Sequence, residues 1–478
     1  MATFRLLERS TRLPDPLSEA FLEAKEALRE CRALIETNSS YMKYDRVLGW
    51  GEYGIVTMWK VYNQRGNHER NVAVKYFLHE NEKWQLRNEI KWMKEFHNLE
   101  HFAQLVQLDE NVLPRQYYNN EKRTQTLMIM EVFPRCDLQE LIYRINGAAA
   151  LNPGAINKRM EYIPTRSLWR IFLCLTRAII GLAYRPPPIS RNGTYREVVR
   201  DNRRARSVVH FDLDPANVFI GKFDSDPANI FGLGFDEIVA RHRYVPALKL
   251  GDFGFSAEWK DRADQLAKQL IGHRGKQPYY APEQRCETRM QSNGAFGSHT
   301  NVWGIGLIMV NLMTKSHPTI NASEVRNVIL HDNTPYQINT WAPYLVEPSA
   351  KLAADNIANG DLARIPYNLR LAVALCMSDD AKERPSLDEL LEIIQENIQR
   401  GDEAARRDRG AGEGARVAKP DDWYRTRLVN ADDEDDELIS KFARDYFLWS
   451  DPYKNDIYEA YWDAAEDAGD VEDAGDAQ

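Results

Sequence analysis

The chain begins with an amphipathic pattern. Apolar side chains recur at spacings of three and four residues between positions 17 and 35, which predicts a helix. The residues on this face are Leu17, Phe21, Ala24, Leu28, Cys31 and Ile35. Such a helix either packs on its own domain or offers its apolar face to a partner, and both interpretations stay open. We treat residues 1–43 as an N-terminal helical extension.

Short β-like runs dominate residues 44–133. Clusters of β-branched and aromatic residues between polar turns predict strands. They lie at Tyr44–Trp50, Ile55–Tyr62, Val72–Phe77 and Leu127–Phe133. The helical run in this part is Glu82–Phe96. Several strands with one main helix predict a small lobe built on an antiparallel sheet.

The apolar spacing in residues 134–398 is mostly helical. It marks Leu138–Asn146, Leu168–Tyr184, Val302–Met313, Leu369–Met377 and Leu387–Ile398. Three polar segments near residues 147–164, 186–206 and 222–245 interrupt the helices, and we expect them to be surface insertions. With 478 residues, 43% of them apolar, the chain is too long for one ordinary core. The pattern therefore predicts an α+β fold of two lobes, the larger one helical.

Acidic charge is concentrated near the C-terminus. Residues 401–478 contain 10 Lys and Arg against 23 Asp and Glu, whereas the other 400 residues carry a net charge of +4. We expect residues 399–478 to form a flexible acidic tail, whose aromatic stretch Leu438–Trp462 folds onto another surface. One candidate surface is the insertion at residues 185–206, which has seven Arg. The alternative for this insertion is a solvated loop.

Composition narrows the classes of partner. A net charge of −9 argues against a general nucleic-acid binder. The longest apolar stretches either contain Arg170 and Arg177 or are only 12 residues long, so we expect no membrane contact. The five cysteines are scattered without a C-x-x-C pair, which predicts reduced thiols and neither a disulfide frame nor a zinc site. With no signal-peptide pattern, we expect an intracellular protein, cytoplasmic or nuclear.

The richest candidate chemistry lies in Val208–Gly221. Two short β-like runs flank a turn that contains Asp212, Asp214 and Asn217. An acid and an amide five residues apart on a rigid loop can accept a hydroxyl proton and bind a hard cation. An ordinary β-turn-β is the alternative, so the neighbouring motifs have to decide.

Two further motifs lie in the predicted small lobe. A glycine-rich turn has the spacing G-x-G-x-x-G-x-V, at Gly49, Gly51, Gly54 and Val56. Glycine lets a backbone approach phosphate oxygens closely, and the strand that follows favours a phosphate-covering hairpin over a dinucleotide fold. Lys75 lies on an otherwise apolar strand and needs a partner. Glu89, on the following helix, is the natural one.

Two more motifs follow in the predicted large lobe. Asp252 begins a D-F-G sequence after a β-like run, and Glu283 ends an A-P-E sequence further on. Arg384 is expected to form a buried ion pair with Glu283.

In this order, the motifs resemble those of the eukaryotic protein kinase superfamily. The resemblance covers about residues 44–398, and the form H-F-D-L-D-P-x-N is similar to that of a divergent group of kinase-like proteins from filamentous fungi. It implies a bilobal protein-kinase fold, with a small antiparallel-sheet lobe at residues 44–133 and a helical lobe at residues 134–398. It also implies ATP and Mg²⁺ as cofactors.

The resemblance implies a role for each matching residue. Asp212 would accept or orient the substrate hydroxyl proton, and Asn217 and Asp252 would bind Mg²⁺. The residues expected around the nucleotide are Gly49, Gly51, Gly54, Val56, Ala73, Lys75, Glu89, Met130, Glu131, Phe133 and Phe219. Of these, Lys75 would also act in catalysis, and Met130 would be the gatekeeper before a hinge at residues 131–133.

Four positions depart from the family pattern. Asp214 replaces a lysine that usually neutralises the γ-phosphate, and Lys276 stands where a threonine is usual. We hypothesise that Lys276 pairs with Asp214 and supplies the missing cation, which would make it catalytic; the alternative is two independent changes in a decaying site. Phe211 replaces the arginine that reads a phosphorylated activation segment, so we expect no regulation of that kind. Asn301 replaces an aspartate that steadies the loop, and its amide can still accept a hydrogen bond.

These features suggest an ATP-dependent protein kinase that acts on Ser or Thr of a protein substrate. The alternative is a pseudokinase, a scaffold that binds nucleotide and partners without phosphotransfer. A small-molecule kinase of the aminoglycoside type is disfavoured by the A-P-E sequence and the expected pairing of Glu283 with Arg384.

Overall fold

The computed structural model describes most of the chain between residues 19 and 448. The described residues are 19–51, 54–77, 83–122, 126–151, 160–186, 194–200, 203–223, 242, 244–260, 262, 265–286, 289–290, 295–316, 322–330, 332–348, 362–410, 434 and 436–448. They belong to two compact units. One unit contains the described residues up to 97 and those of 103–134, and the other contains 98–102 and the described residues from 135 to 448.

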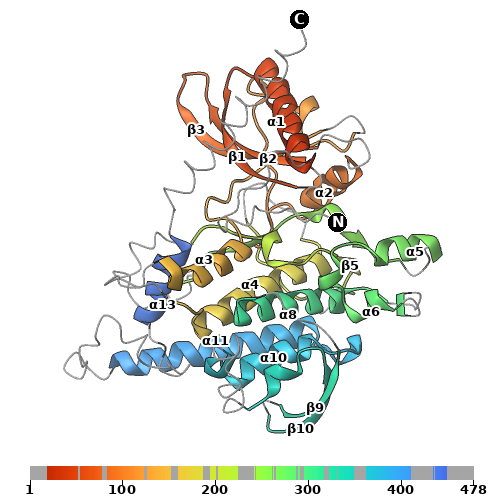
Figure 1. Cartoon of the computed structure of the whole chain (residues 1–478), viewed down its shortest axis with the longest axis vertical. Helices are drawn as coiled ribbons and strands as arrows, with labels where there is room; N and C mark the ends of the chain where they lie inside the picture. The colour runs from red at the N-terminus through yellow and green to blue at the C-terminus, as the bar shows by residue number, and fades with distance from the viewer. Residues whose placement is uncertain are drawn as a thin grey trace, which may run out of the picture. The chain divides into compact units, whose positions relative to one another are not determined.

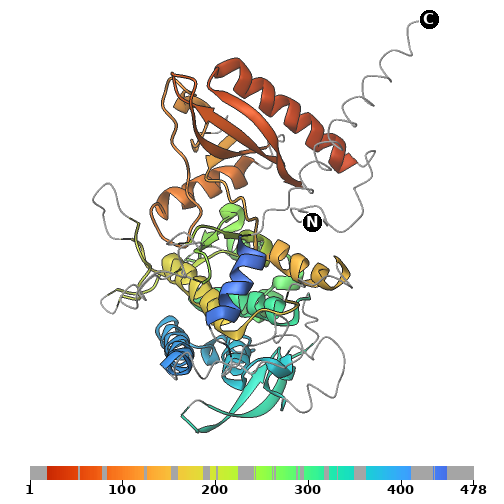
Figure 2. The same cartoon turned by 90° about the vertical axis from the view of Figure 1, so that its left-hand side faces the viewer.

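The first unit is a four-stranded antiparallel sheet with two helices. The strands follow the order β1 (Met42–Gly51), β2 (Gly54–Tyr62), β3 (His68–Tyr76) and β4 (Leu127–Met130). Helix α1 (Glu19–Asn38) lies along one face of the sheet (Figure 2), and α2 (Lys83–Glu95) follows β3. Phe21 and Cys31 of α1 share one buried cluster with Trp59 of β2. The N-terminal helix therefore packs on its own unit, the first of the two interpretations.

The pleat of this sheet separates core from candidate site. Successive side chains of a strand point to opposite faces. Ile55 and Trp59 of β2 belong to the cluster with α1, so Val56 lies on the other face. Lys75 is paired directly with Val56 across β2 and β3, and directly paired residues share a face.

The second unit is built around buried helices. Helix α4 (Thr165–Ala183) packs against α8 (Ser298–Thr314) and α11 (Leu387–Gly410), and α8 packs against α10 (Tyr367–Cys376) (Figure 1). The shorter helices are α3 (Leu138–Leu151), α5 (Gln265–Gly272), α6 (Pro282–Arg285) and α13 (Asp436–Phe442), with a π-helical turn at Ala443–Phe447. Among the described residues, the 3₁₀ turns are Arg115–Tyr117 in the first unit and, in the second, Pro215–Asn217, Phe253–Phe255, Gln277–Tyr279, Pro343–Val346, Leu362–Arg364 and Ala381–Glu383.

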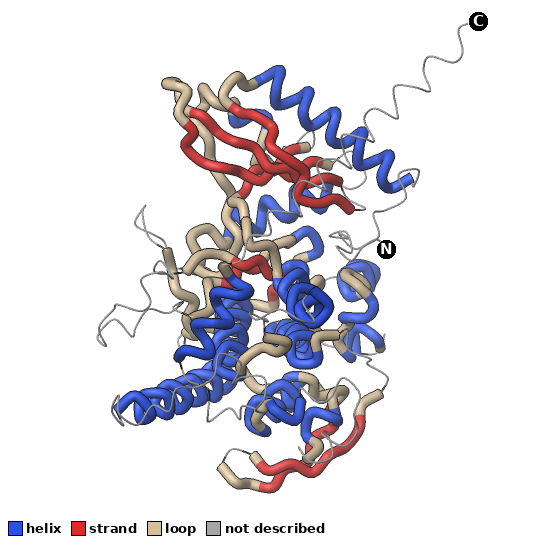
Figure 3. The backbone as a smooth tube through the Cα atoms, turned by 60° about the vertical axis from the view of Figure 1, so that its left-hand side comes forward, coloured by secondary structure: helices blue, strands red, loops and turns tan. Residues whose placement is uncertain are grey.

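Three two-stranded pairs complete the second unit. They are β5 (Val208–Val209) with β8 (Ala257–Glu258), β6 (Val218–Ile220) with β7 (Leu248–Leu250), and β9 (Glu324–Ile329) with β10 (Pro335–Thr340). Figure 3 shows the β9–β10 hairpin in red, projecting from the helical part of this unit. No helix among the described residues is long and apolar enough to cross a membrane.

Several boundaries differ from the sequence prediction. Helix α11 continues to Gly410 instead of ending at Ile398, so the expected flexible tail does not begin at residue 399. Helix α3 runs to Leu151, and the strand expected at Leu127–Phe133 ends at Met130. The β9–β10 hairpin was not predicted, because its strands are mostly polar and several of its apolar side chains are exposed.

Candidate active site

The β6–β7 pair brings the two expected cation ligands to one end of a ladder. Val218 pairs with Leu250, so Asn217 precedes one strand where Asp252 follows the other. The N–H of Gly251 donates to the carbonyl of Asn217 at 3.0 Å. Asp252 adopts a left-handed backbone conformation, with φ of 59°. The pairing thus holds an amide and a carboxylate, both hard oxygen donors suited to Mg²⁺, close together.

Asn217 also fixes the orientation of Asp212. The side-chain Nδ2 of Asn217 donates to the carbonyl of Asp212 at 2.8 Å and to its Oδ2 at 3.0 Å. The other carboxylate oxygen, Oδ1, is buried and has no hydrogen-bond partner among the described residues. Because Nδ2 makes both bonds, the side-chain oxygen of Asn217 is the atom that can bind a cation. Asp212 is therefore held rigidly with one acceptor oxygen left for another donor.

The predicted contact between Lys276 and Asp214 is present. Lys276 Nζ forms an ion pair with Asp214 Oδ2 and lies 3.6 Å from Asp212 Oδ1. The second oxygen of Asp214, Oδ1, accepts the N–H of Ala216 at 2.7 Å and caps the turn at Pro215–Asn217. Both carboxylate oxygens of Asp214 are thus bound, and the lysine reaches the catalytic-loop carboxylates from a distant part of the chain.

Gly275 permits this approach, and sequence reasoning missed it. Its φ is +89°, and a Cβ at this position would lie 1.8 Å from the carbonyl oxygen of Phe211. A side chain there would force the backbone segment and the loop apart. Close backbone contact between two distant segments leaves no local signal beyond the glycine itself.

Burial and charge shift the ionisation of the loop. Burial raises the pKa of Asp212 to about 7, with Lys276 opposing the shift and Asp214 adding to it. Burial also acts against the charge of Lys276, but the carboxylates of Asp214 and Asp212 raise its pKa overall. Burial lowers the pKa of His210 to about 4, so its neutral ring can donate from Nε2 to the carbonyl of Gly251 at 3.0 Å.

The first unit holds its own set of expected residues. Lys75 Nζ donates to Glu89 Oε2 at 2.7 Å, and the side chains are 6% and 2% exposed, which confirms the predicted contact. Ala73, two residues from Lys75 on β3, shares its face of the sheet, as does Val56. The turn between β1 and β2 brings Gly49 opposite Val56. Residues 52 and 53 of the glycine-rich turn lie outside the described residues.

Gly54 needs its glycine for the same steric reason as Gly275. Its φ is +134°, and a Cβ would lie 1.9 Å from the carbonyl oxygen of Tyr76. Gly51 pairs with Gly54 at the tight end of the β1–β2 ladder.

The remaining expected nucleotide contacts are placed as follows. Met130, the last residue of β4, is buried and pairs with Ala73. Glu131 exchanges two hydrogen bonds of 3.0 Å with the backbone of Gln104, and Phe133 lies two residues further on in an irregular segment. Phe219 is half-buried between the buried residues Val218 and Ile220 of β6, in the second unit.

Two other predicted contacts are present in the second unit. Arg384 donates to both carboxylate oxygens of Glu283, at 2.9 and 2.8 Å. Asn301 Oδ1 accepts the N–H of His210 at 3.1 Å, as predicted, and its Nδ2 donates to the carbonyl of Val208 at 2.8 Å. An aspartate could make only the first of these bonds.

The protein kinase domain family matches residues 204–393, which include the loop, the D-F-G and A-P-E sequences and Arg384. This match supports membership of the protein kinase superfamily. The four-stranded antiparallel sheet of the chain and its helical second unit fit the bilobal α+β fold of these kinases. The match begins after Lys75 and Glu89, so those residues rest on the geometry given above. No curated protein matches the chain.

Phe211 of the catalytic loop packs against apolar residues near the start of the activation segment. The ring of Phe211 is buried in an apolar cluster and meets Phe296 edge-on, with ring centroids 5.5 Å apart. Ser256 is 1% exposed, and its hydroxyl contacts the carbonyl of His210 at 3.4 Å. An apolar cluster therefore fills the place where the family pattern has an arginine.

Proposed function

We propose that the chain is an ATP- and Mg²⁺-dependent protein kinase that phosphorylates Ser or Thr of a protein substrate. The observation that carries the proposal is the arrangement of Asp212. Its Oδ1 lacks a hydrogen-bond partner among the described residues, while Lys276 Nζ lies 3.6 Å away. A proton acceptor and a cation side by side are the two groups that phosphoryl transfer to a hydroxyl needs.

The chemistry follows from these positions. The substrate hydroxyl gives its proton to Asp212 Oδ1 while its oxygen forms a bond to the γ-phosphorus, and the bond from that phosphorus to the bridging oxygen of ADP breaks. Lys276 stabilises the charge that spreads over the phosphoryl oxygens. Asn217 and Asp252 would hold Mg²⁺, which neutralises phosphate charge when bound, and Lys75 would bind the phosphates. The acceptor is proposed as Ser or Thr, because the turn from Asp214 to Asn217 lacks the arginine of tyrosine kinases.

One observation favours the pseudokinase alternative. Asp214 caps the turn at Pro215–Asn217, a structural role that would keep it in a protein with no phosphotransfer. In that case Lys276 serves only to neutralise a buried carboxylate. The two functions differ in turnover and agree in nucleotide binding.

The test is turnover of ATP and Mg²⁺ on an array of Ser-, Thr- and Tyr-containing peptides, with full-length wild type and Asp212→Asn. We expect phosphorylated Ser or Thr peptides from wild type, and a rate at least about 10²-fold lower from the variant. Equal signal from both proteins would point to a contaminating kinase. Nucleotide binding without turnover by wild type would establish the pseudokinase instead.

A further inference from the structure

A buried cluster of metal-binding side chains lies in the second unit, apart from the catalytic loop. His101, Cys174 and His242 each offer one ligand atom, and these atoms all lie within 4.8 Å of one another. The three residues are 0%, 3% and 3% exposed. Cys174 follows His101 by 73 residues and precedes His242 by 68. Such wide spacing is not a recognisable zinc-binding motif in the sequence.

The orientation of His101 leaves a single nitrogen for a ligand. Its Nδ1 contacts Glu197 Oε2 at 2.7 Å, and its backbone N–H donates to Glu197 Oε1 at 2.8 Å. The other nitrogen, Nε2, is fully buried and forms no well-aligned hydrogen bond among the described residues, and the ring interacts with Cys174. A buried polar atom without a well-aligned partner is costly, and it needs an explanation such as an ion.

His242 repeats this arrangement. One ring nitrogen, Nδ1, lies 3.8 Å from Cys174 Sγ, and the other, Nε2, lies 3.5 Å from Glu100 Oε1. Each histidine therefore has a carboxylate beside one ring nitrogen, and each also interacts with Cys174. A carboxylate behind a histidine is the usual outer support of a metal ligand, because it fixes the ring and its tautomer.

We propose that His101, Cys174 and His242 bind one Zn²⁺ ion. In a tetrahedral site, bond lengths of about 2.3 Å to sulfur and about 2.0 Å to nitrogen place the sulfur and a nitrogen ligand about 3.5 Å apart. The 3.8 Å between Cys174 Sγ and His242 Nδ1 is close to this separation. A small fourth ligand such as water completes a tetrahedron. The cysteine thiolate and the carboxylates of Glu100 and Glu197 are negatively charged. Together they balance the positive charges of the ion and of buried Arg177, which interacts with Glu100.

The proposed role of the site is structural, because His242 and the supporting Glu197 come from two of the expected insertions, whereas Cys174 lies on a buried helix. Cys174 lies on α4, His242 at the end of the insertion near residues 222–245, and Glu197 in the insertion near residues 186–206. Two backbone hydrogen bonds hold the insertion near residues 186–206 beside His101. Tyr195 N–H donates to the carbonyl of Asn98 at 2.7 Å, and Glu100 N–H donates to the carbonyl of Tyr195 at 2.8 Å. The ion fastens both insertions to the buried helix α4.

The first test is the zinc content of the full-length chain, produced with zinc and dialysed. We expect about one Zn²⁺ per chain in wild type and in Cys376→Ser, a control at another buried cysteine, and less than about one tenth of that in Cys174→Ser and His101→Gln. Chelation of wild type should also lower its melting temperature. Zinc-free wild type, or equal zinc in Cys174→Ser and wild type, would overturn the proposal.

A second measurement guards against variants that fail to fold. Co²⁺ added to zinc-depleted wild type should give a thiolate-to-cobalt charge-transfer band, with the intense visible absorption of a tetrahedral site. Addition of Zn²⁺ should remove both. Octahedral cobalt without a thiolate band would contradict the assignment and leave the cluster as a hydrogen-bonded network. Neither test uses kinase activity, so the result is independent of the proposed function.

Discussion

Asp214 illustrates how one residue can seem wrong in sequence and fit in structure. By the family pattern its carboxylate should repel a phosphate. In the structure one oxygen caps a turn and the other is paired with Lys276. The negative charge of Asp214 is therefore largely neutralised by these contacts. The same ion pair holds Lys276 near Asp212.

The ionisation of Asp212 gives a prediction about stability. Its pKa is raised from 3.8 to about 7 in the folded state. The folded state then binds more protons than the unfolded state between these values, so this carboxyl lowers the free energy of unfolding as pH rises through that window. Asp212→Asn should be more stable than wild type by about 1–3 kcal/mol at pH 8, with a smaller difference at pH 5. Urea unfolding at the two pH values measures this.

Asp379 provides a control, because its pKa is shifted in the opposite direction to that of Asp212. Hydrogen bonds from Arg289 and Trp341 outweigh burial and lower its pKa. Asp379→Asn should therefore lose stability at both pH values. A difference for Asp212→Asn that shrinks as pH rises would contradict the assignment.

Gly275 gives a second prediction. Gly275→Ala should reduce phosphotransfer by at least about 10²-fold, because the new Cβ would meet the carbonyl of Phe211 and displace Lys276. Gly66 is the matched control, since it also has a positive φ, of +77°, but has open space around its Cβ position. Steady-state kinetics of both variants checks this, and an equal loss in the two would assign the effect to backbone strain alone.

At the scale of elements, we expect the activation segment to work without a phosphate switch. Ser256 is the sole Ser or Thr in residues 255–278, and it is buried. Ser256→Ala should keep activity within about threefold of wild type, and mass spectrometry of active protein should find no stoichiometric phosphate between residues 255 and 278. Activity that requires phosphate on Ser256 would sink this account.

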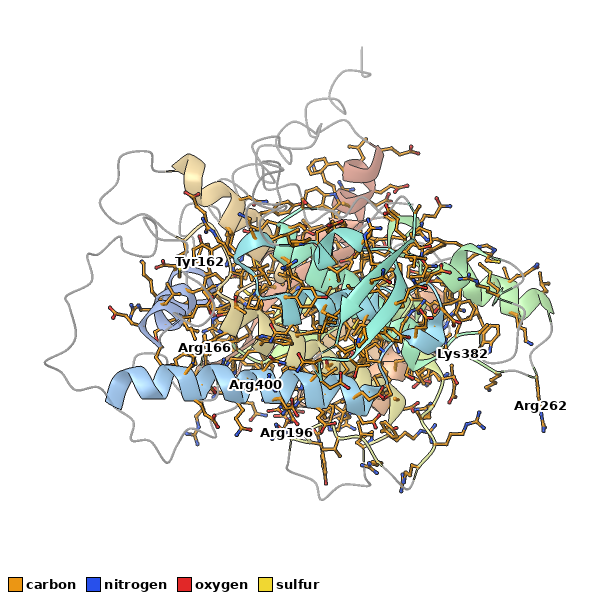
Figure 4. The ribbon with its side chains drawn as sticks, turned by 90° about the horizontal axis from the view of Figure 1, so that it is seen from below. Tyr162, Arg166, Arg196, Arg262, Lys382 and Arg400 are labelled. Atoms are coloured by element: carbon orange, nitrogen blue, oxygen red, sulfur yellow. The ribbon has the colours of Figure 1, made fainter. Side chains whose placement is uncertain are left out.

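The C-terminal segment docks on the second unit. The carboxylate of Glu434 accepts the N–H groups of Thr165 and Arg166 at 2.7 and 2.8 Å, and so caps α4. Arg166, which is labelled beside α11 in Figure 4, also forms ion pairs with Asp402 of α11 and with Asp436. The predicted contact between the tail and residues 185–206 stays a prediction.

This cap should contribute measurably to stability. Glu434→Ala should lower the free energy of unfolding by about 1–2 kcal/mol, as the loss of a helix cap does. The exposed neighbour Glu437 is the control, and Glu437→Ala should change stability by less than about 0.5 kcal/mol. Urea unfolding compares the two variants directly. Similar losses of stability in both would show that the effect comes from the overall charge of this segment and not from the cap.

At the scale of the whole molecule, the order of the motifs along the chain, from the glycine-rich turn to the A-P-E sequence, was enough to predict the bilobal fold. They also predicted the contacts of Lys75 with Glu89, of Lys276 with Asp214 and of Arg384 with Glu283, because a buried charge requires a partner and the sequence offers few. What the sequence could not indicate depends on tertiary contact alone. The close approach at Gly275, the cap from Glu434 and the cluster around Cys174 join segments far apart in the chain.

The central claim is that Lys276 supplies the cation for phosphoryl transfer. The most direct measurement is the single-turnover rate at saturating ATP and Mg²⁺ of wild type, Lys276→Ala and the double variant Asp214→Lys/Lys276→Thr, which restores the family pattern. Lys276→Ala should bind nucleotide and lose roughly 10²–10³ in rate, and the double variant should recover most of it. An unchanged rate in Lys276→Ala would contradict the account.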